Sequence, residues 1–583
     1  MKHLREKNLK VLKENHIYHE NMEHDACGVG LVVSTEGQKS RKVVESGIEA
    51  LKAVWHRGAI DADGKTGDGA GIHIEIPTDF FIEKIEVTGH SHDDSELCVG
   101  MIFLPRNDYG AQEACRTIVE SELTKNNFNI YGWRQVPVNP SVLGEKAELT
   151  RPEITQILFK HNNKKLKDKE LNRSLYETRR IIEKQASSNQ LNGFYICSFS
   201  SKSIIYKGMF LAEAIDDFYP DLKDERFVSR YSIFHQRFST NTAPSWDLAQ
   251  PFRSLAHNGE INTLKGNINW MKVHEQEMHS PLFQNVENLK PVIPSGNSDS
   301  ASLDNVFELL TTSGHSAPLA KLMLIPDAWS KKSKVLPKEH LQLFNFLNSS
   351  MEPWDGPAAI AGTDNEWAIV ASDRNGLRPM RYTITNEKLL FAGSETGMID
   401  IDENKIIEKG RLGPGEILGI RIEKGKIFRN TEIKNYLAKQ LLEDPTGMQA
   451  LYKTHEESTG DYLSEELRKL EEEVAEFQVF NYKFAVRVFK PSEKIHCTFI
   501  NEDGKPMQQW FLSYADFKEA FGNEVHTKMA ILDVSMPTEP EYKSDTSKKT
   551  PFIVETGVAV HEKHSWEAEK IKESRTYYLH IDK

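Results

Sequence analysis

A cysteine near the start of the chain has the side chain best suited to nucleophilic chemistry. Cys27 lies in HDACGVG (24–30), after a mostly polar stretch and before a Gly-Val-Gly. A cysteine thiolate is a strong nucleophile, but the thiol is mostly protonated at neutral pH and needs a base. A free cysteine is also a common residue of buried cores. Both interpretations of this residue are open when it is taken alone.

Four other segments place charged, polar or glycine residues between predicted strands and helices. Taken singly, each has a structural explanation. Asn-Gly is a common turn dipeptide, Ser298, Asp299 or Ser300 could cap a helix, and an arginine can form a surface ion pair. The segments are HRGAIDADGKTGDGAG (56–71), QRFSTNT (236–242), AHNGEINT (256–263) and SGNSDSASLDN (295–305).

Short apolar stretches flanked by glycine predict a core rich in strands, with helices outside it. Residues 43–59 have apolar positions at helical spacing, which predicts a helix that ends near Gly58. The glycine-rich TGDGAG (66–71) is expected to be a tight loop. Strands are expected within 28–34, 72–76, 98–105, 194–200, 232–240, 254–262 and 367–373.

The composition is that of an ordinary globular protein. The net charge of -13 over 583 residues argues against nucleic-acid binding, and no apolar run is long enough to cross a membrane. The five scattered cysteines disfavour a disulfide framework, a zinc site or an iron–sulfur site, and favour a reducing cytoplasm. No phosphate-binding or dinucleotide-binding motif is present, so neither a cofactor nor a metal is expected.

Residues 441–583 have no assignment. Apolar residues from Asp461 to Phe477 form a short heptad stripe, best explained by one amphipathic helix. Several strand-like stretches follow, with a helix expected at 516–521, and together they predict a small α+β module.

Taken together, the motifs resemble the glutamine amidotransferase domain of glutamate synthase, a class II amidotransferase and N-terminal-nucleophile hydrolase. The matching segments keep the family's order over about residues 16 to 440 and include MLIPDAW, MEPWDGPAAI, SDRNGLRPMRY and GRLGPGE. The resemblance implies an α+β fold, the αββα four-layer sandwich, over 27–440, with an insertion at about 106–193. It also implies that residues 1–26 are a leader removed before Cys27.

The resemblance further implies a role for each of six residues. The nucleophile matches Cys27, and the oxyanion-hole pair matches Asn258 and Gly259. Three matches are predicted to bind substrate: Arg237 for the glutamine carboxylate, Asp299 for its ammonium, and Arg57 as an arginine close to the nucleophile.

These roles predict hydrolysis of L-glutamine to glutamate and ammonia through a cysteinyl thioester. No histidine can be assigned as the base, but removal of the leader would free the α-amine of Cys27, with a pKa of about 8. Gly28 and Gly30 are then expected to let the chain bend and bring backbone close to the substrate.

The family's synthases continue into a flavin-binding barrel with iron–sulfur ligands, and this sequence has neither. We therefore expect a separate synthase-type subunit to receive the ammonia. The alternatives are a glutaminase acting alone and a glutamine sensor or regulatory subunit without turnover. No nucleic-acid or membrane partner is expected.

Overall fold

The computed structural model describes residues 27–443 except 167, 238–242 and 330–335, and seven strands between 478 and 560. The chain divides into two compact units, Met1–Lys439 and Gln440–Lys583.

The strand that follows Cys27 lies inside a seven-stranded antiparallel sheet. The strand order is β14-β12-β13-β1-β8-β2-β7. In β1, Val29, Leu31 and Val33 face one side and Val32 faces the other, which is the alternation expected of a strand. All seven residues of β1 are buried, because both faces of the sheet are covered. The strands are β1 (Gly28–Ser34), β2 (Ala70–Glu75), β7 (Ser203–Gly208), β8 (Tyr231–Gln236), β12 (Arg381–Thr385), β13 (Leu389–Gly393) and β14 (Ile406–Arg411).

A second sheet of five antiparallel strands packs on the first, in the order β16-β15-β11-β10-β9. Its inner face is rich in alanine, and these small side chains join Val29, Leu31 and Ile233 of the first sheet in one buried cluster. Small side chains let the two sheets approach closely. The strands are β9 (Leu255–Gly259), β10 (Ala358–Thr363), β11 (Trp367–Ser372), β15 (Ile417–Arg421) and β16 (Lys426–Phe428).

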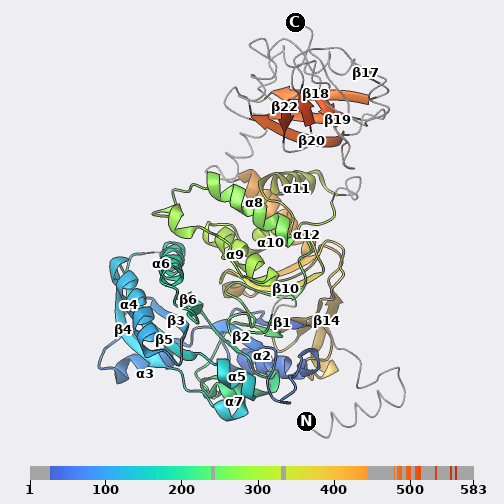
Figure 1. Cartoon of the computed structure of the whole chain (residues 1–583). Coiled ribbons are helices and arrows are strands. Elements are labelled where there is room, and N and C mark those ends of the chain that lie inside the picture. The colour runs from blue at the N-terminus through green and yellow to red at the C-terminus, as the bar shows by residue number, and fades with distance from the viewer. Residues whose placement is uncertain are drawn as a thin grey trace. The chain divides into compact units, whose positions relative to one another are not determined.

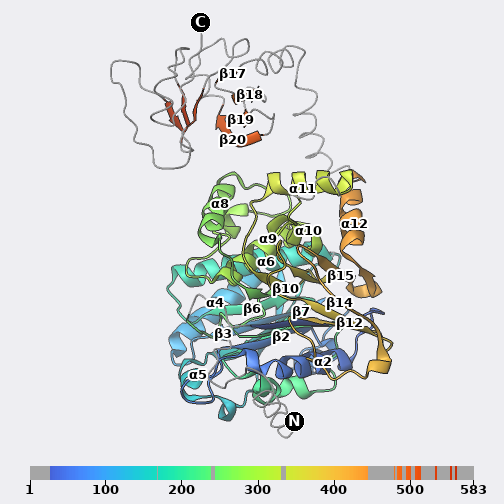
Figure 2. The same cartoon turned by 90° about the vertical axis from the view of Figure 1, so that its right-hand side faces the viewer.

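Helices cover the outer face of each sheet. Helix α2 (Arg41–Ala53) packs on β1, β2 and β8, whereas α9 (Asp299–Thr312) and α10 (Ala317–Leu324) pack on the second sheet (Figures 1 and 2). The order helix, sheet, sheet, helix confirms the predicted αββα four-layer sandwich. Further helices described between residues 27 and 443 are α3 (Thr78–Val87), α5 (Glu145–Thr150), α7 (Ile215–Phe218), α8 (Leu264–Glu277), α11 (Lys338–Ser350) and α12 (Asn430–Glu443).

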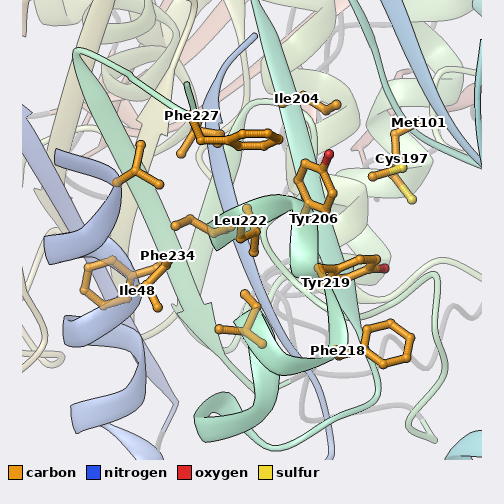
Figure 3. Packing of buried hydrophobic residues seen from close by; sticks show 14 of the residues in the cluster. Ile48, Met101, Cys197, Ile204, Tyr206, Phe218, Tyr219, Leu222, Phe227 and Phe234 are labelled. Carbon is orange, nitrogen blue, oxygen red and sulfur yellow. The ribbon is translucent and has the colours of Figure 1, made fainter. Parts of the chain in front are cut away.

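Aromatic side chains fill the space between α2 and the first sheet and continue past the helix (Figure 3). The rings of Tyr206 and Tyr219 meet edge to face with centroids 5.0 Å apart, a geometry that aromatic pairs prefer. Phe234 points from β8 toward Ile48 of α2 in the same cluster. This packing fixes β8, the strand that leads to Arg237.

A third sheet, in the order β4-β5-β3-β6, lies in and around the segment predicted to be an insertion. Helices α4 (Tyr109–Lys125) and α6 (Asp168–Ser188) pack against it. Its elements run from Leu97 to Ser200, so they extend beyond the predicted 106–193 at both ends. The strands are β3 (Leu97–Leu104), β4 (Phe128–Gln135), β5 (Glu153–His161) and β6 (Tyr195–Ser200).

Three sequence-based expectations need correction. The helix predicted to end near Gly58 ends at Ala53, and a single 3₁₀ turn, Trp55–Arg57, follows it. Ala70 and Gly71 belong to β2 rather than to the predicted loop.

Gly28 and Gly30 do not bend the chain, because both lie inside the regular strand β1. A Cβ at Gly28 would lie 2.7 Å from Val54 Cγ2, and one at Gly30 would collide with the Phe234 ring. Packing under α2 therefore requires both glycines.

The second unit contains a four-stranded meander, β17-β18-β19-β20, and a three-stranded sheet, β21-β23-β22. Residues 1–26 and the helices predicted at 461–477 and 516–521 lie outside the described residues. The strands are β17 (Gln478–Val479), β18 (Tyr482–Val488), β19 (Lys494–Ile500), β20 (Pro506–Ser513), β21 (Leu532–Val534), β22 (Phe552–Val554) and β23 (Val558–Val560).

Candidate active site

Cys27 directly precedes β1 and meets a residue of the second sheet. Its side chain is buried, and its backbone carbonyl accepts a 2.5 Å hydrogen bond from Asn258 Nδ2. Asn258 and Gly259 are the last two residues of β9, so the Asn-Gly is not the turn that its composition allowed. The contact between the sheets therefore places the predicted oxyanion-hole amide at the predicted nucleophile.

Gly259 has a backbone that only glycine adopts easily. Its φ is +156°, and a Cβ there would collide with the carbonyl oxygen of Pro357. The neighbouring N–H of Glu260 donates to that same carbonyl at 2.9 Å. The close approach of Pro357 thus explains why glycine follows Asn258.

Arg237 leaves β8 with an unusual backbone. Its φ is +97°, which costs a residue with a Cβ about 1–3 kcal/mol. Its N–H donates to Gly69 O at 2.7 Å. Backbone strain of this kind is common where a side chain is held for binding, and here it directs a side chain that is only 12% exposed.

Asp68 is a site residue that the sequence did not reveal. Its Oδ2 lies 3.1 Å from Arg237 Nε, and its side chain is 6% exposed. Burial raises the pKa of Asp68 to about 7, against the opposing effect of Arg237. The only sequence signal was an acid in the glycine-rich loop, which is equally typical of a solvated turn.

Asp299 is the first residue of α9, and the structure excludes it as the helix cap. Ser298 caps the helix instead, because its Oγ accepts from Ala301 N at 3.1 Å. The Asp299 carboxylate accepts from Ile261 N at 2.9 Å and from Ser300 N at 2.7 Å. It is buried at a helix N-terminus, where a negative charge is favoured.

Arg57 lies in the 3₁₀ turn after α2, where Glu395 holds it. Its Nε and Nη2 donate to Glu395 Oε2 at 2.9 and 2.6 Å. His56 Nε2 lies 2.8 Å from the other oxygen of this carboxylate. Ser394, the residue before Glu395, donates its N–H to Val29 O at 2.9 Å. Arg57 is thereby attached beside the start of β1.

Charges of both signs act on the Cys27 thiol, but its burial has the largest effect. Burial raises the pKa of Cys27 to about 12, Arg237 and Arg378 oppose this rise, and Asp68 and Asp299 add to it. The thiol is therefore protonated at neutral pH, and its nucleophilic form needs a base. Arg378 lies in SDRNGLRPMRY, but nothing in that segment distinguished it from the two neighbouring arginines.

Within the described residues, no group of three or more His, Cys, Asp or Glu side chains is placed to hold a metal ion. No helix in that part of the chain is long and apolar enough to span a membrane.

The family model for class II glutamine amidotransferases matches residues 27–442. The chain belongs to this family. The match starts at Cys27 and includes both sheets of the sandwich.

Curated relatives are glutamate synthases. The large chain of the NADPH enzyme of Azospirillum brasilense is 57% identical over 432 residues, which cover 74% of this chain and 28% of that protein. Ferredoxin-dependent glutamate synthase 2 of Arabidopsis thaliana, a chloroplastic protein, is 38% identical over 79% of this chain and 28% of its own length. The chain thus spans somewhat over a quarter of the length of these relatives.

Two solved structures are more distantly similar. The allosteric regulatory enzyme of purine biosynthesis is 21% identical with a TM-score of 0.25, over 39% of this chain and 40% of that one. The glutamine PRPP amidotransferase of B. subtilis is 22% identical with a TM-score of 0.24 over the same shares. Both TM-scores are too low to support a conclusion about this chain.

Proposed function

We propose that this protein hydrolyses L-glutamine to glutamate and ammonia, with Cys27 as the nucleophile. The observation that carries the proposal is the 2.5 Å hydrogen bond from Asn258 Nδ2 to the backbone carbonyl of Cys27. Amide hydrolysis needs a hydrogen-bond donor beside the carbonyl under attack. Asn258 Nδ2 donates to the backbone carbonyl of Cys27, so it lies close to the Cys27 side chain. The amide is therefore near the place where the Cys27 sulfur would attack a substrate carbonyl.

The reaction has two steps. The Cys27 thiolate attacks the side-chain carbonyl carbon of glutamine, and Asn258 Nδ2 with the Gly259 N–H holds the resulting oxyanion. The intermediate collapses when the C–N bond breaks, and the nitrogen leaves as ammonia after it takes up a proton. Water then attacks the thioester, which releases glutamate and restores the thiol.

The α-amine of Cys27 is the proposed base. A thiol with a raised pKa transfers its proton only to a group held next to it. Cleavage of the Ala26–Cys27 bond would place an amine with a pKa of about 8 on the nucleophile itself. We therefore propose that residues 1–26 are removed before the protein becomes active.

Two charged groups select glutamine in this proposal. Arg237 offers a planar fork to the α-carboxylate, and Asp299 offers a buried negative charge to the α-ammonium. The helix-capping alternative for Asp299 is gone, since Ser298 caps α9. Arg57, held by Glu395, positions the turn beside β1.

The ammonia is proposed to pass to a synthase-type acceptor site on a separate subunit. The similarity to glutamate synthases several times longer than the matched segment supports this partner. Ammonia released into water would be protonated, so a coupled enzyme needs a shielded path. The predicted cytoplasmic location stays a prediction.

The test is a glutaminase assay joined to an intact-mass measurement on the full chain expressed in its native host. We expect ammonia release, a mass that lacks residues 1–26, and no activity in Cys27→Ser. Cys197→Ser is the matched control, because this thiol is equally buried and its pKa is also raised to about 12. Glutamine binding without ammonia release would favour the sensor alternative, and activity with residues 1–26 retained would disprove the maturation step.

A further inference from the structure

A buried histidine lies between the two halves of the candidate site. His235 is on β8, paired with Val29 of β1 and Gly71 of β2, and it is completely buried. Its strand neighbours Val29 and Ile233 belong to the apolar cluster between the sheets. A polar ring in such surroundings is stable only if its nitrogens find partners.

Both ring nitrogens of His235 face backbone carbonyl oxygens. Nδ1 lies 2.8 Å from Arg237 O, and Nε2 lies 3.1 Å from His257 O. Burial lowers the pKa of His235 to about 3, so the ring is neutral and carries one proton. The shorter contact assigns this proton to Nδ1, which then donates to the carbonyl of Arg237. Nε2 then carries a lone pair, so its approach to the carbonyl of His257 is not a hydrogen bond.

The two carbonyls belong to the two parts of the candidate site. The first carbonyl belongs to Arg237, whose φ is +97°. A hydrogen bond from His235 Nδ1 to this carbonyl stabilises the backbone that presents the guanidinium. The carbonyl of His257 immediately precedes Asn258, and Gln250 Nε2 donates to it at 3.2 Å. One imidazole therefore spans from the end of β8 to the end of β9.

We propose that His235 is a positioning residue, which holds the backbone of Arg237 for glutamine recognition. This proposal rests on the glutaminase function proposed above. His235 does not touch the reacting atoms; it acts through Arg237.

The chain offers a matched control for this role. His73 on β2 is also completely buried, pairs with Ile233 in the same sheet, and has its pKa lowered to about 3 by burial. Its Nε2 lies 3.4 Å from the hydroxyl of Tyr231. This contact involves neither Arg237 nor Asn258. The same substitution at both positions separates a lost site contact from a general loss of a buried histidine.

The experiment compares His235→Phe with His73→Phe by glutamine kinetics, L-glutamate binding and thermal unfolding. We expect His235→Phe to raise the KM for glutamine and the Kd for glutamate about tenfold, the effect of one lost buried hydrogen bond. We expect its kcat to change less than its KM, since the hydrogen bonds of His257 O and of Asn258 Nδ2 do not involve the ring. His73→Phe should leave KM and Kd within about twofold of the wild-type values, which is the scatter expected of a distant substitution. This should hold even if the Tm of His73→Phe falls as much as the Tm of His235→Phe.

Two further variants test the route of the effect. His235→Gln keeps a side-chain N–H donor and should recover part of the KM, and it serves as the main test if the phenylalanine variant does not fold. In His235→Phe with Arg237→Lys, the KM should be no higher than in Arg237→Lys alone, because residues that act through one another are not additive.

If the wild-type protein hydrolyses glutamine, two results would overturn the positioning role of His235. One is an equal change in KM and Kd for His235→Phe and His73→Phe, and the other is an additive effect on KM in the double variant. A wild-type protein that neither hydrolyses glutamine nor binds glutamate would overturn the proposed function as well.

Discussion

Asp68 and Arg237 leave neighbouring strands side by side and form a buried ion pair, with Oδ2 and Nε 3.1 Å apart. The last register pair of β2 and β8 is Ala70 with Gln236, so the sheet itself brings these two residues together. Because Asp68 contacts the Nε edge, it orients the guanidinium whose terminal nitrogens we assign to the glutamine carboxylate.

Asp68→Asn should therefore weaken glutamine recognition. We expect the KM for glutamine to rise about tenfold or more, with a smaller change in kcat, because Arg237 loses the charge that orients it. Asp327→Asn is the matched control, since Asp327 Oδ2 lies 3.1 Å from Lys434 Nζ in an equally buried pair. Steady-state kinetics of both variants decide the matter, and an unchanged KM in Asp68→Asn would refute the orienting role.

Asp68→Asn should become more stable relative to the wild type as the pH rises. The pKa of Asp68 is about 7 in the folded protein and 3.8 unfolded, so the folded state holds its proton more tightly. Wild-type stability from this group is full below pH 4 and is lost as the pH rises to about 7, a loss of up to about 4 kcal/mol. Asp68→Asn escapes this loss. Denaturant unfolding from pH 5 to pH 8 should show its advantage growing, whereas a constant difference would contradict the raised pKa.

Removal of the Asn258 amide should act on turnover. We expect Asn258→Ala to lower kcat about 10²- to 10³-fold with little change in KM, because the donor matters most when the oxyanion forms. Asn267→Ala is the control, since Asn267 is buried and its Nδ2 donates to the carbonyl of Pro353 at 3.0 Å. If the Asn258 variant changed KM alone, Asn258 would not be the oxyanion donor.

Substrate-guided alkylation should separate Cys27 from a second thiol of similar acidity. Burial raises the pKa of both Cys27 and Cys197 to about 12, so intrinsic thiol reactivity predicts equal and slow labelling. A diazoketone analogue of glutamine should label Cys27 alone, and glutamine should protect it. Peptide mapping by mass spectrometry gives the answer, and labelling at Cys98, Cys115, Cys197 or Cys497 would indicate an unguided reaction.

Asp299→Asn should affect both binding and stability. The carboxylate accepts N–H bonds from Ile261 and Ser300, and an asparagine can accept only through its single oxygen. We expect a higher KM for glutamine together with a Tm lower by several degrees. A raised KM at unchanged Tm would mean that the two backbone contacts contribute nothing to folding.

The strands of the sandwich were predictable where a short apolar stretch is flanked by glycine, and β1 was predicted over its whole length. The helix after it was predicted too long, because the apolar spacing continues through a 3₁₀ turn that only the packed structure reveals. Asp68 and His235 were not identified as site residues. Their environment depends on sheet pairing between segments far apart in the sequence, and a single acid or histidine carries no local sign of it.

The glycines illustrate a second limit. Gly28 and Gly30 were assigned to substrate approach because they follow the predicted nucleophile. Their Cα atoms instead face Val54 and Phe234, which lie under and beside α2. Glycine next to a functional residue indicates close packing, but the sequence does not say which side the neighbour is on.

The positions of β1 and β8 within their sheet have a consequence for how the site opens. Strand β1 pairs with β13 and β8, and β8 pairs with β1 and β2, so freeing either strand requires the loss of two ladders. Cys27 lies one residue before β1, and Arg237 lies one residue beyond the end of β8. We therefore expect the nucleophile and the arginine to lose their positions in the same cooperative opening of this sheet, rather than one after the other.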